Sequence, residues 1–121
     1  MKEQKFRKLD VWNKAIDFIE EIYRLTNRFP NDELYGLTSQ IRRAATSIAL
    51  NIAEGSGADS DKEFKRFLNI ALRSNYELMC GIEIASRLKY CAITEKERIL
   101  IKSDELSAML VGLKRKLKAE G

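Results

Sequence analysis

The chain has 121 residues, of which 45% are hydrophobic and 33% are charged, and it contains six Gly and one Pro. This length favours a single domain over residues 1–121, because two separate domains would each bury too little apolar surface to be stable. The chain contains no His, which removes the commonest general base and the usual protein ligand for metals. We therefore expect a helix-rich, non-enzymatic protein without a cofactor or metal.

The charge, the cysteines and the N-terminal residues narrow the class of protein further. Twenty-two Lys and Arg against eighteen Asp and Glu give a net charge of +4, which suits either an anionic partner or a solvated surface of mixed sign. Cys80 and Cys91 form no Cys-x-x-Cys pair, so we expect reduced thiols and no zinc site. Residues 1–7 are charged rather than apolar, and no segment approaches the roughly 18 apolar residues of a membrane span. We expect a cytoplasmic protein without membrane contacts.

Apolar residues recur at spacings of three and four through most of the chain, which is typical of helices with one face packed on a core. Residues that break helices lie at 29–31, 55–57 and 89–94 and divide the chain into four such segments. In chain order, the apolar positions are Trp12, Ala15, Ile19, Ile22 and Tyr23; Leu34, Leu37, Ile41, Ala45, Ile48 and Ile52; Phe64, Leu68, Ala71, Leu78, Ile82 and Ala85; and Ile99, Leu106, Leu110, Leu113 and Leu117.

The expected helix ends carry residues that cap helices. Asp10 and Asn31 can cap the first and second helices, and Gly55 suits the C-terminal end of the second. Ser60–Glu63 and Thr94–Glu97 each match the capping box, in which a hydroxyl and a carboxylate bond to backbone amides at a helix start. Four helices joined by short connections predict an all-α, antiparallel up-down-up-down four-helix bundle. Its third helix, of about 28 residues, is expected to extend over roughly 40 Å.

A polar stripe follows the expected second helix. Its members, at spacings of three and four, are Gln40, Arg43, Ser47, Asn51 and Glu54. At 100° per residue these side chains share one narrow strip beside the apolar face. The strip is either the solvated border of that face or an interface between subunits that Arg and amide side chains orient. Glu54 faces the negative end of the helix dipole, so we expect a cation from another helix or subunit to compensate it.

Small and apolar residues outside one core face indicate self-association. Gly36, Gly81 and Gly112 are costly inside helices and are better tolerated where another backbone approaches closely. The first and third helices also carry apolar residues on more than one face, as at the adjacent Val11 and Trp12, and a single four-helix core does not readily cover them all. The alternative is that such aromatic side chains are partly exposed, which is common in monomers.

Positive charge gathers in three parts of the sequence. The first part is residues 1–8, expected to be a flexible basic arm, with Lys2, Lys5, Arg7 and Lys8. The second is the start of the third helix, with Lys62, Lys65 and Arg66. The third is the end of the fourth helix, with Lys114, Arg115, Lys116 and Lys118. Neither of the last two clusters requires a ligand. In the third helix, Asp61 can pair with Lys65 and Glu63 with Arg66. At the end of the fourth helix, cations are favoured by the helix dipole. If the clusters align on one face, they form a surface that binds nucleic-acid phosphates without reading sequence.

Motifs for catalysis or phosphate binding are not evident. Ser39, Ser47 and the two cysteines have no His to act as their base. The segment Gly55-Ser56-Gly57 lacks the Lys-Ser/Thr of a phosphate-binding loop and is therefore interpreted as a turn.

Several of these residues together form a recognisable pattern. They are Leu9, Val11-Trp12, Ala15, Phe29-Pro30, Glu33, Leu37, Gln40, Arg43-Ala44, Ser47-Ile48 and Asn51-Ile52-Ala53-Glu54-Gly55. In this pattern the chain resembles the four-helix-bundle proteins encoded in intervening sequences of bacterial 23S ribosomal RNA genes. It departs from them at Ala49, where Pro is frequent, and at Arg73 before Ser74, where Gly is usual.

The resemblance implies a homopentamer of antiparallel four-helix bundles with no established catalytic activity. A similar bundle is the accessory variability determinant of diversity-generating retroelements, a basic pentamer that engages a reverse transcriptase and nucleic acid. We therefore expect a homo-oligomer, a pentamer by this resemblance, that binds structured RNA or another nucleic acid through repeated basic surfaces. The alternative is a scaffold for an unknown protein partner, in which the basic residues serve solubility only.

Overall fold

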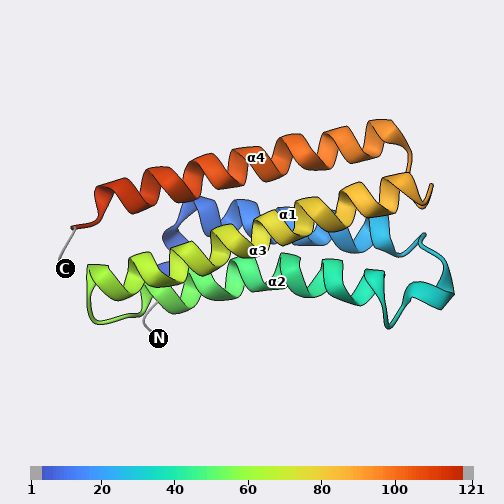
Figure 1. The fold of residues 1–121 in the computed structure, drawn as a ribbon. Coiled ribbons are helices and arrows are strands. Elements are labelled where there is room, and N and C mark those ends of the chain that lie inside the picture. Colours follow the sequence, from blue (N-terminus) through green and yellow to red (C-terminus); the bar gives the residue numbers. More distant parts are fainter. Residues whose placement is uncertain (1–3, 119–121) are drawn as a thin grey trace.

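The structure is a computed structural model that describes residues 4–118. Within these residues it contains four α-helices and no strand, which confirms the all-α prediction. The helices lie side by side as elongated rods (Figure 1). In chain order the elements are the 3-10 helix η1 (Lys5–Lys8), α1 (Asp10–Thr26), the 3-10 helix η2 (Asn31–Glu33), α2 (Leu37–Ser56), α3 (Asp61–Arg87) and α4 (Ile93–Lys116).

The core runs along the inside of all four helices. The predicted apolar positions Ile22, Ile48, Leu78 and Leu110, one from each helix, are completely buried. The most extensive contact is between α2 and α3. Burying this apolar surface supplies the main free energy that holds the helices together.

Two glycines explain how closely α2 and α3 approach each other. A Cβ atom added at Gly81 would lie 2.7 Å from Cγ1 of Ile41, and one added at Gly55 would lie 2.8 Å from Phe64 and Phe67. Gly81 therefore serves close packing against a side chain of its own chain, and the predicted approach of another backbone or subunit is not seen there. Gly55 lies inside α2 and is not its end, because the helix continues to Ser56.

The other two glycines singled out in the sequence do not bring two α-helices together, although a Cβ added at Gly36 would lie 2.8 Å from Oε1 of Glu33. Gly36 precedes α2 and is outside the helix interior. A Cβ added at Gly112, inside α4, would meet no atom within 4 Å.

The helix starts agree with the cap prediction at one place and differ at three. Ser60 caps α3, and its Oγ accepts a hydrogen bond of 3.1 Å from the Glu63 amide, as predicted. Asp10 is the first residue of α1 rather than its cap. Asn31 begins η2, and α2 starts only after Gly36.

The start of α4 differs from the prediction because a different carboxylate is used. The helix begins at Ile93 with Ala92 as its cap residue, and Oε1 of Glu95 accepts the Ala92 amide at 3.0 Å. Thr94 therefore lies inside the helix.

The segment predicted as a basic arm packs on α1 over residues 5–8. The Phe6 ring meets the Trp12 ring edge-on, with 4.7 Å between their centroids. Nδ2 of Asn13 donates to the carbonyls of Arg7 and Leu9, both at 3.0 Å. Lys2 lies outside the described residues. None of the helices between residues 4 and 118 combines the length and the apolar composition that crossing a membrane requires.

Candidate functional site

The polar stripe of α2 lines a groove beside α3. All five of its residues, Gln40, Arg43, Ser47, Asn51 and Glu54, border this groove, which encloses about 680 Å³. Leu50 lies in the same wall and is 67% exposed. Helix α3 contributes Ser74 and Glu77 to the opposite wall. The 100° periodicity of the sequence thus places the stripe on one surface, as predicted.

The inner members of the α2 stripe bond within the chain. Oγ of Ser47 lies 2.8 Å from Oγ of Ser74, so the two hydroxyls link α2 to α3. Nδ2 of Asn51 donates to the carbonyl and to Oγ of Ser47, at 2.8 and 3.0 Å. These bonds stabilise the helix pair.

The outer members of the α2 stripe are Gln40, Arg43 and Glu54, and all three are exposed. Among residues 4–118, neither the guanidinium of Arg43 nor the carboxylate of Glu54 forms a hydrogen bond or an ion pair. The pKa of Arg66 on α3 is raised, mainly by its hydrogen bond to Glu63 and also by the charge of Glu54. No cation among residues 4–118 contacts the Glu54 carboxylate, so the expected compensating cation stays a prediction.

Two of the basic clusters meet at one end of the bundle. The backbone amide of Lys118 donates to Oδ2 of Asp61 at 2.9 Å, and Nζ of Lys114 donates to Oδ1 of Asn69 at 2.7 Å. The end of α4 therefore lies against the start of α3, and Figure 1 shows the start of α1 at the same end. Lys8, just before α1, and Lys116 line one cleft there.

We call this region the basic end and define it by residues 5–10, 59–66 and 112–118. These segments hold ten Lys and Arg against four Asp and Glu, a net charge of +6, whereas the whole chain carries +4. The rest of the chain is therefore net acidic, and the positive potential is concentrated at one end. Such a concentration attracts a polyanion more strongly than the small total charge suggests.

Only part of the basic end is neutralised by local pairs. Arg66 donates to both carboxylate oxygens of Glu63 at 3.1 to 3.3 Å, which confirms that predicted pair and lowers the pKa of Glu63. The predicted pair of Asp61 with Lys65 does not form, because Asp61 accepts the Lys118 amide instead. Within the described residues, the side chains of seven of its ten cations have no hydrogen-bond acceptor or ion-pair partner: Lys5, Lys8, Lys62, Lys65, Arg115, Lys116 and Lys118.

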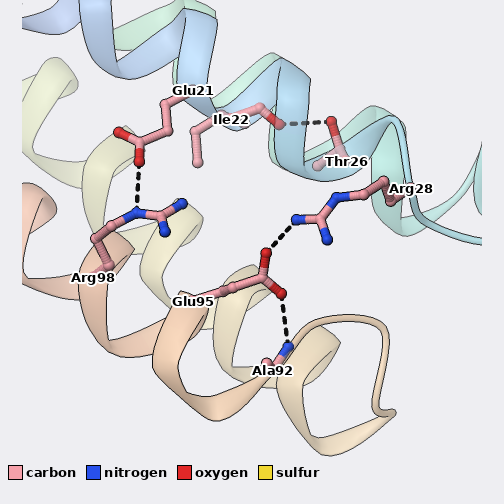
Figure 2. A network of polar contacts seen from close by, with 7 residues as sticks. All are labelled: Glu21, Ile22, Thr26, Arg28, Ala92, Glu95 and Arg98. Atoms are coloured by element: carbon pink, nitrogen blue, oxygen red, sulfur yellow. Dashed lines mark hydrogen bonds and ion pairs between the residues drawn. The ribbon is translucent and has the colours of Figure 1, made fainter.

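A polar network between α1 and α4 was not found from the sequence (Figure 2). Glu21 accepts from Arg98 at 2.8 Å and from Lys102 at 2.6 Å. Burial raises the pKa of Glu21, but these two cations outweigh it, so the pKa lies below its ordinary value. Nearby, Glu95 pairs with Arg28 and caps α4, and the Ala92 amide and Arg28 lower its pKa. The sequence does not indicate these ion pairs, because Glu21 and Arg28 lie more than 60 positions from the residues with which they pair.

A second missed feature lies inside the core. Asn75 is completely buried, and its Nδ2 donates to the Ser103 carbonyl at 2.8 Å and to Oγ of Ser107 at 2.9 Å. Oγ of Ser103 donates back to Oδ1 of Asn75 at 3.0 Å. The only sign in the sequence was the interruption of the apolar repeat of the third helix at Asn75. Across the described part of the chain, no three His, Cys, Asp or Glu side chains are grouped so as to hold a metal ion.

Comparison with known proteins agrees with this architecture. Residues 7–112 match the family profile of the 23S rRNA-intervening sequence protein. A crystal structure of a protein with unknown function from the S23 ribosomal protein family of Bacteroides thetaiotaomicron is similar, with a TM-score of 0.80 and 30% sequence identity. The similarity covers 87% of this chain and 98% of that chain. No curated protein matches the sequence. The family profile spans most of the chain, and the chain therefore belongs to the 23S rRNA-intervening sequence protein family.

Proposed function

We propose that this protein is a non-enzymatic, cytoplasmic homo-oligomer, a pentamer, that binds structured RNA or another nucleic acid through its basic end. The observation that carries the proposal is the meeting of three basic segments, far apart in sequence, at one end of the bundle. Its seven unpaired cations are free to contact phosphates. Such contacts supply affinity without reading base sequence.

The proposal includes the antiparallel up-down-up-down arrangement of the helices. Contacts between helix ends support it. The bond from Lys118 to Asp61 joins the end of α4 to the start of α3, and the pair of Arg28 with Glu95 joins the region after α1 to the start of α4. This arrangement brings the start of α3 and the end of α4 to the basic end.

Assembly through the α2 stripe is the second part of the proposal. The unpaired charges of Arg43 and Glu54 and the exposed Leu50 support an interface, because they mix a central apolar contact with orienting polar groups. The resemblance to pentameric bundles, including the accessory variability determinant of diversity-generating retroelements, supports five subunits. A pentamer repeats the basic end five times, and repeated binding surfaces raise affinity through avidity.

The test is binding to structured RNA and duplex DNA over a series of salt concentrations. The variant Arg115→Gln with Lys116→Gln removes two unpaired cations of the basic end. The matched control is Arg87→Gln with Lys89→Gln, which removes two exposed cations near the end of α3, away from the basic end. Native mass is measured for all three proteins, so that a change in assembly is not mistaken for a change in the surface.

The wild type is expected to lose affinity linearly in log salt, since each neutralised phosphate releases counterions. The variant of the basic end is expected to reduce the slope by about 0.9 for each lost phosphate contact, while the control keeps the wild-type slope. Absence of binding at low salt by the assembled wild type contradicts the proposal. That result would favour the scaffold for a protein partner.

A further inference from the structure

A cleft lies within the basic end, between the start of α1 and the end of α4. It encloses about 420 Å³, and its charged lining residues are Lys8, Lys116 and Asp10. Its apolar lining residues are Leu9, Val11, Met109 and Leu113. Leu9, Met109 and Leu113 are only partly buried, so apolar surface remains open to a ligand. A lining that combines apolar side chains with two cations suits an apolar group attached to an anion.

Gly112 keeps this cleft open. It lines the cleft, and a Cβ added there would meet nothing within 4 Å. A glycine inside a helix reduces stability relative to Ala, and here no close packing requires it. The space above Gly112 is therefore a feature of the cleft and not of the core.

The cleft is held in shape before any ligand arrives. Asn13 donates to the carbonyls of Arg7 and Leu9, and Phe6 packs on Trp12, so η1 and Lys8 are fixed relative to α1. A site of fixed shape loses less entropy on binding.

A second pocket lies beyond the cleft along α1 and α4, and Met109 lines both. Its charged lining residues are four carboxylates and three cations: Asp17, Glu20, Glu21, Glu105, Lys14, Arg24 and Lys102. This pocket therefore lacks the positive excess of the basic end, and phosphates are attracted to the cleft instead.

We infer that this cleft receives an unstacked base of a single-stranded nucleic acid, with Lys8 and Lys116 holding the adjoining phosphates. This inference rests on the proposed function and specifies the ligand of its basic end. Bases of a duplex are stacked inside the helix and cannot enter, so the cleft adds affinity only for single strands or unpaired loops. The net charge of +6 at the basic end is complementary to the phosphates on both sides of the base.

The test compares three ligands by fluorescence anisotropy: a single-stranded RNA, an abasic strand of equal length, and the matching RNA duplex. Gly112→Leu fills the cleft where the structure has open space, so the variant is expected to fold with an unchanged or higher Tm. The control is Ala108→Leu, which adds the same side chain at an exposed position of the same helix.

The wild type is expected to bind the single strand about tenfold more tightly than the abasic strand, the range expected for one base contact. Gly112→Leu is expected to lose that tenfold advantage and to keep its affinity for the abasic strand and the duplex. Ala108→Leu is expected to bind all three ligands as the wild type does.

Three results would overturn the inference. Equal wild-type affinity for the normal and abasic strands excludes a base contact, and wild-type single-strand binding by Gly112→Leu excludes this cleft. Loss of duplex binding by Gly112→Leu assigns Gly112 to the phosphate surface instead. In each case nucleic-acid binding itself stands, whereas failure of the wild type to bind any of the three ligands at low salt overturns the proposed function as well.

Discussion

Adjacent residues of α2 have opposite roles because one step along a helix turns the side chain by 100°. Nε of Arg42 donates to Oγ1 of Thr26 at 2.8 Å, and its guanidinium lies 4.6 Å above the centre of the Tyr23 ring. Arg42 thereby ties α2 to α1 within the chain. Arg43 faces the groove and has no such partner among residues 4–118.

The two arginines are therefore expected to respond differently to replacement by Ala. Arg43→Ala is expected to weaken assembly, because its proposed partner carboxylate on another subunit loses its counter-charge, and to leave monomer stability nearly unchanged. Arg42→Ala is expected to lower the free energy of unfolding by about 1–2 kcal/mol, through lost hydrogen bonds and stacking. Native mass at low concentration and urea unfolding separate the two effects. An unchanged native mass for both Arg43→Ala and Glu54→Ala argues against the α2 stripe as an interface.

Asn75 shows how one polar residue can fix the alignment of two helices. Its bonds to Ser103 and Ser107 form only when α3 and α4 are in the observed register. Replacing Asn75 by Ala leaves the Ser103 hydroxyl buried without this partner, which is expected to cost about 1–3 kcal/mol. Urea unfolding of Asn75→Ala measures the cost, and wild-type stability would show that the network contributes nothing.

At the scale of the helices, the glycines of α3 and α4 predict opposite outcomes for one substitution. Gly81→Ala is expected to lower the free energy of unfolding by about 1–3 kcal/mol, since the new Cβ would crowd Ile41. Gly112→Ala is expected to raise it by about 0.5–1 kcal/mol, because open space accepts the methyl group and Ala favours the helix. Thermal unfolding of both variants checks the signs, and a change in the same direction for both contradicts the packing described here.

The contact of α1 with α4 depends on pH through Glu21. Its pKa is lower in the folded protein than in the unfolded chain, because Arg98 and Lys102 outweigh the effect of burial. The ion pairs therefore contribute fully above the ordinary carboxylate pKa of about 4.3, and their contribution disappears as the pH falls through the folded value.

Glu21→Gln removes this contribution and is expected to lower the free energy of unfolding at neutral pH by up to about 1 kcal/mol. The difference from the wild type is expected to shrink as the pH falls below about 4.3. Urea unfolding at a series of pH values measures it. A difference that stays constant down to acid pH would show that the carboxylate charge of Glu21 is not involved.

For the whole molecule, the sequence predicts more of the core than of the helix ends. The apolar repeat correctly places Ile22 and Leu78 in the core, because burial follows directly from helical periodicity. Asn31 and Thr94 are capable caps that the fold does not use. Glu33 bonds to the Tyr90 hydroxyl and the Leu37 amide, and Glu95 pairs with Arg28, so distant contacts decide where α2 and α4 begin.

The candidate site is likewise predictable only in its local parts. The α2 stripe lies on a single helix, so its alignment follows from spacing, although its role as an interface stays a prediction. The convergence of the basic clusters depends on which helix ends meet in space. The cleft beside Gly112 depends on the packing of η1, where the sequence predicts only a flexible arm.

Both described ends of the chain, Gln4 and Lys118, lie beside the basic end (Figure 1). A label attached at Gln4 or Lys118 therefore lies next to the surface that the binding experiments probe. The loop between α1 and α2 lies at the far end of the bundle, where Tyr35 is 94% exposed. A label placed in that loop leaves the basic end uncovered, so the position of a tag is itself an experimental variable for this protein.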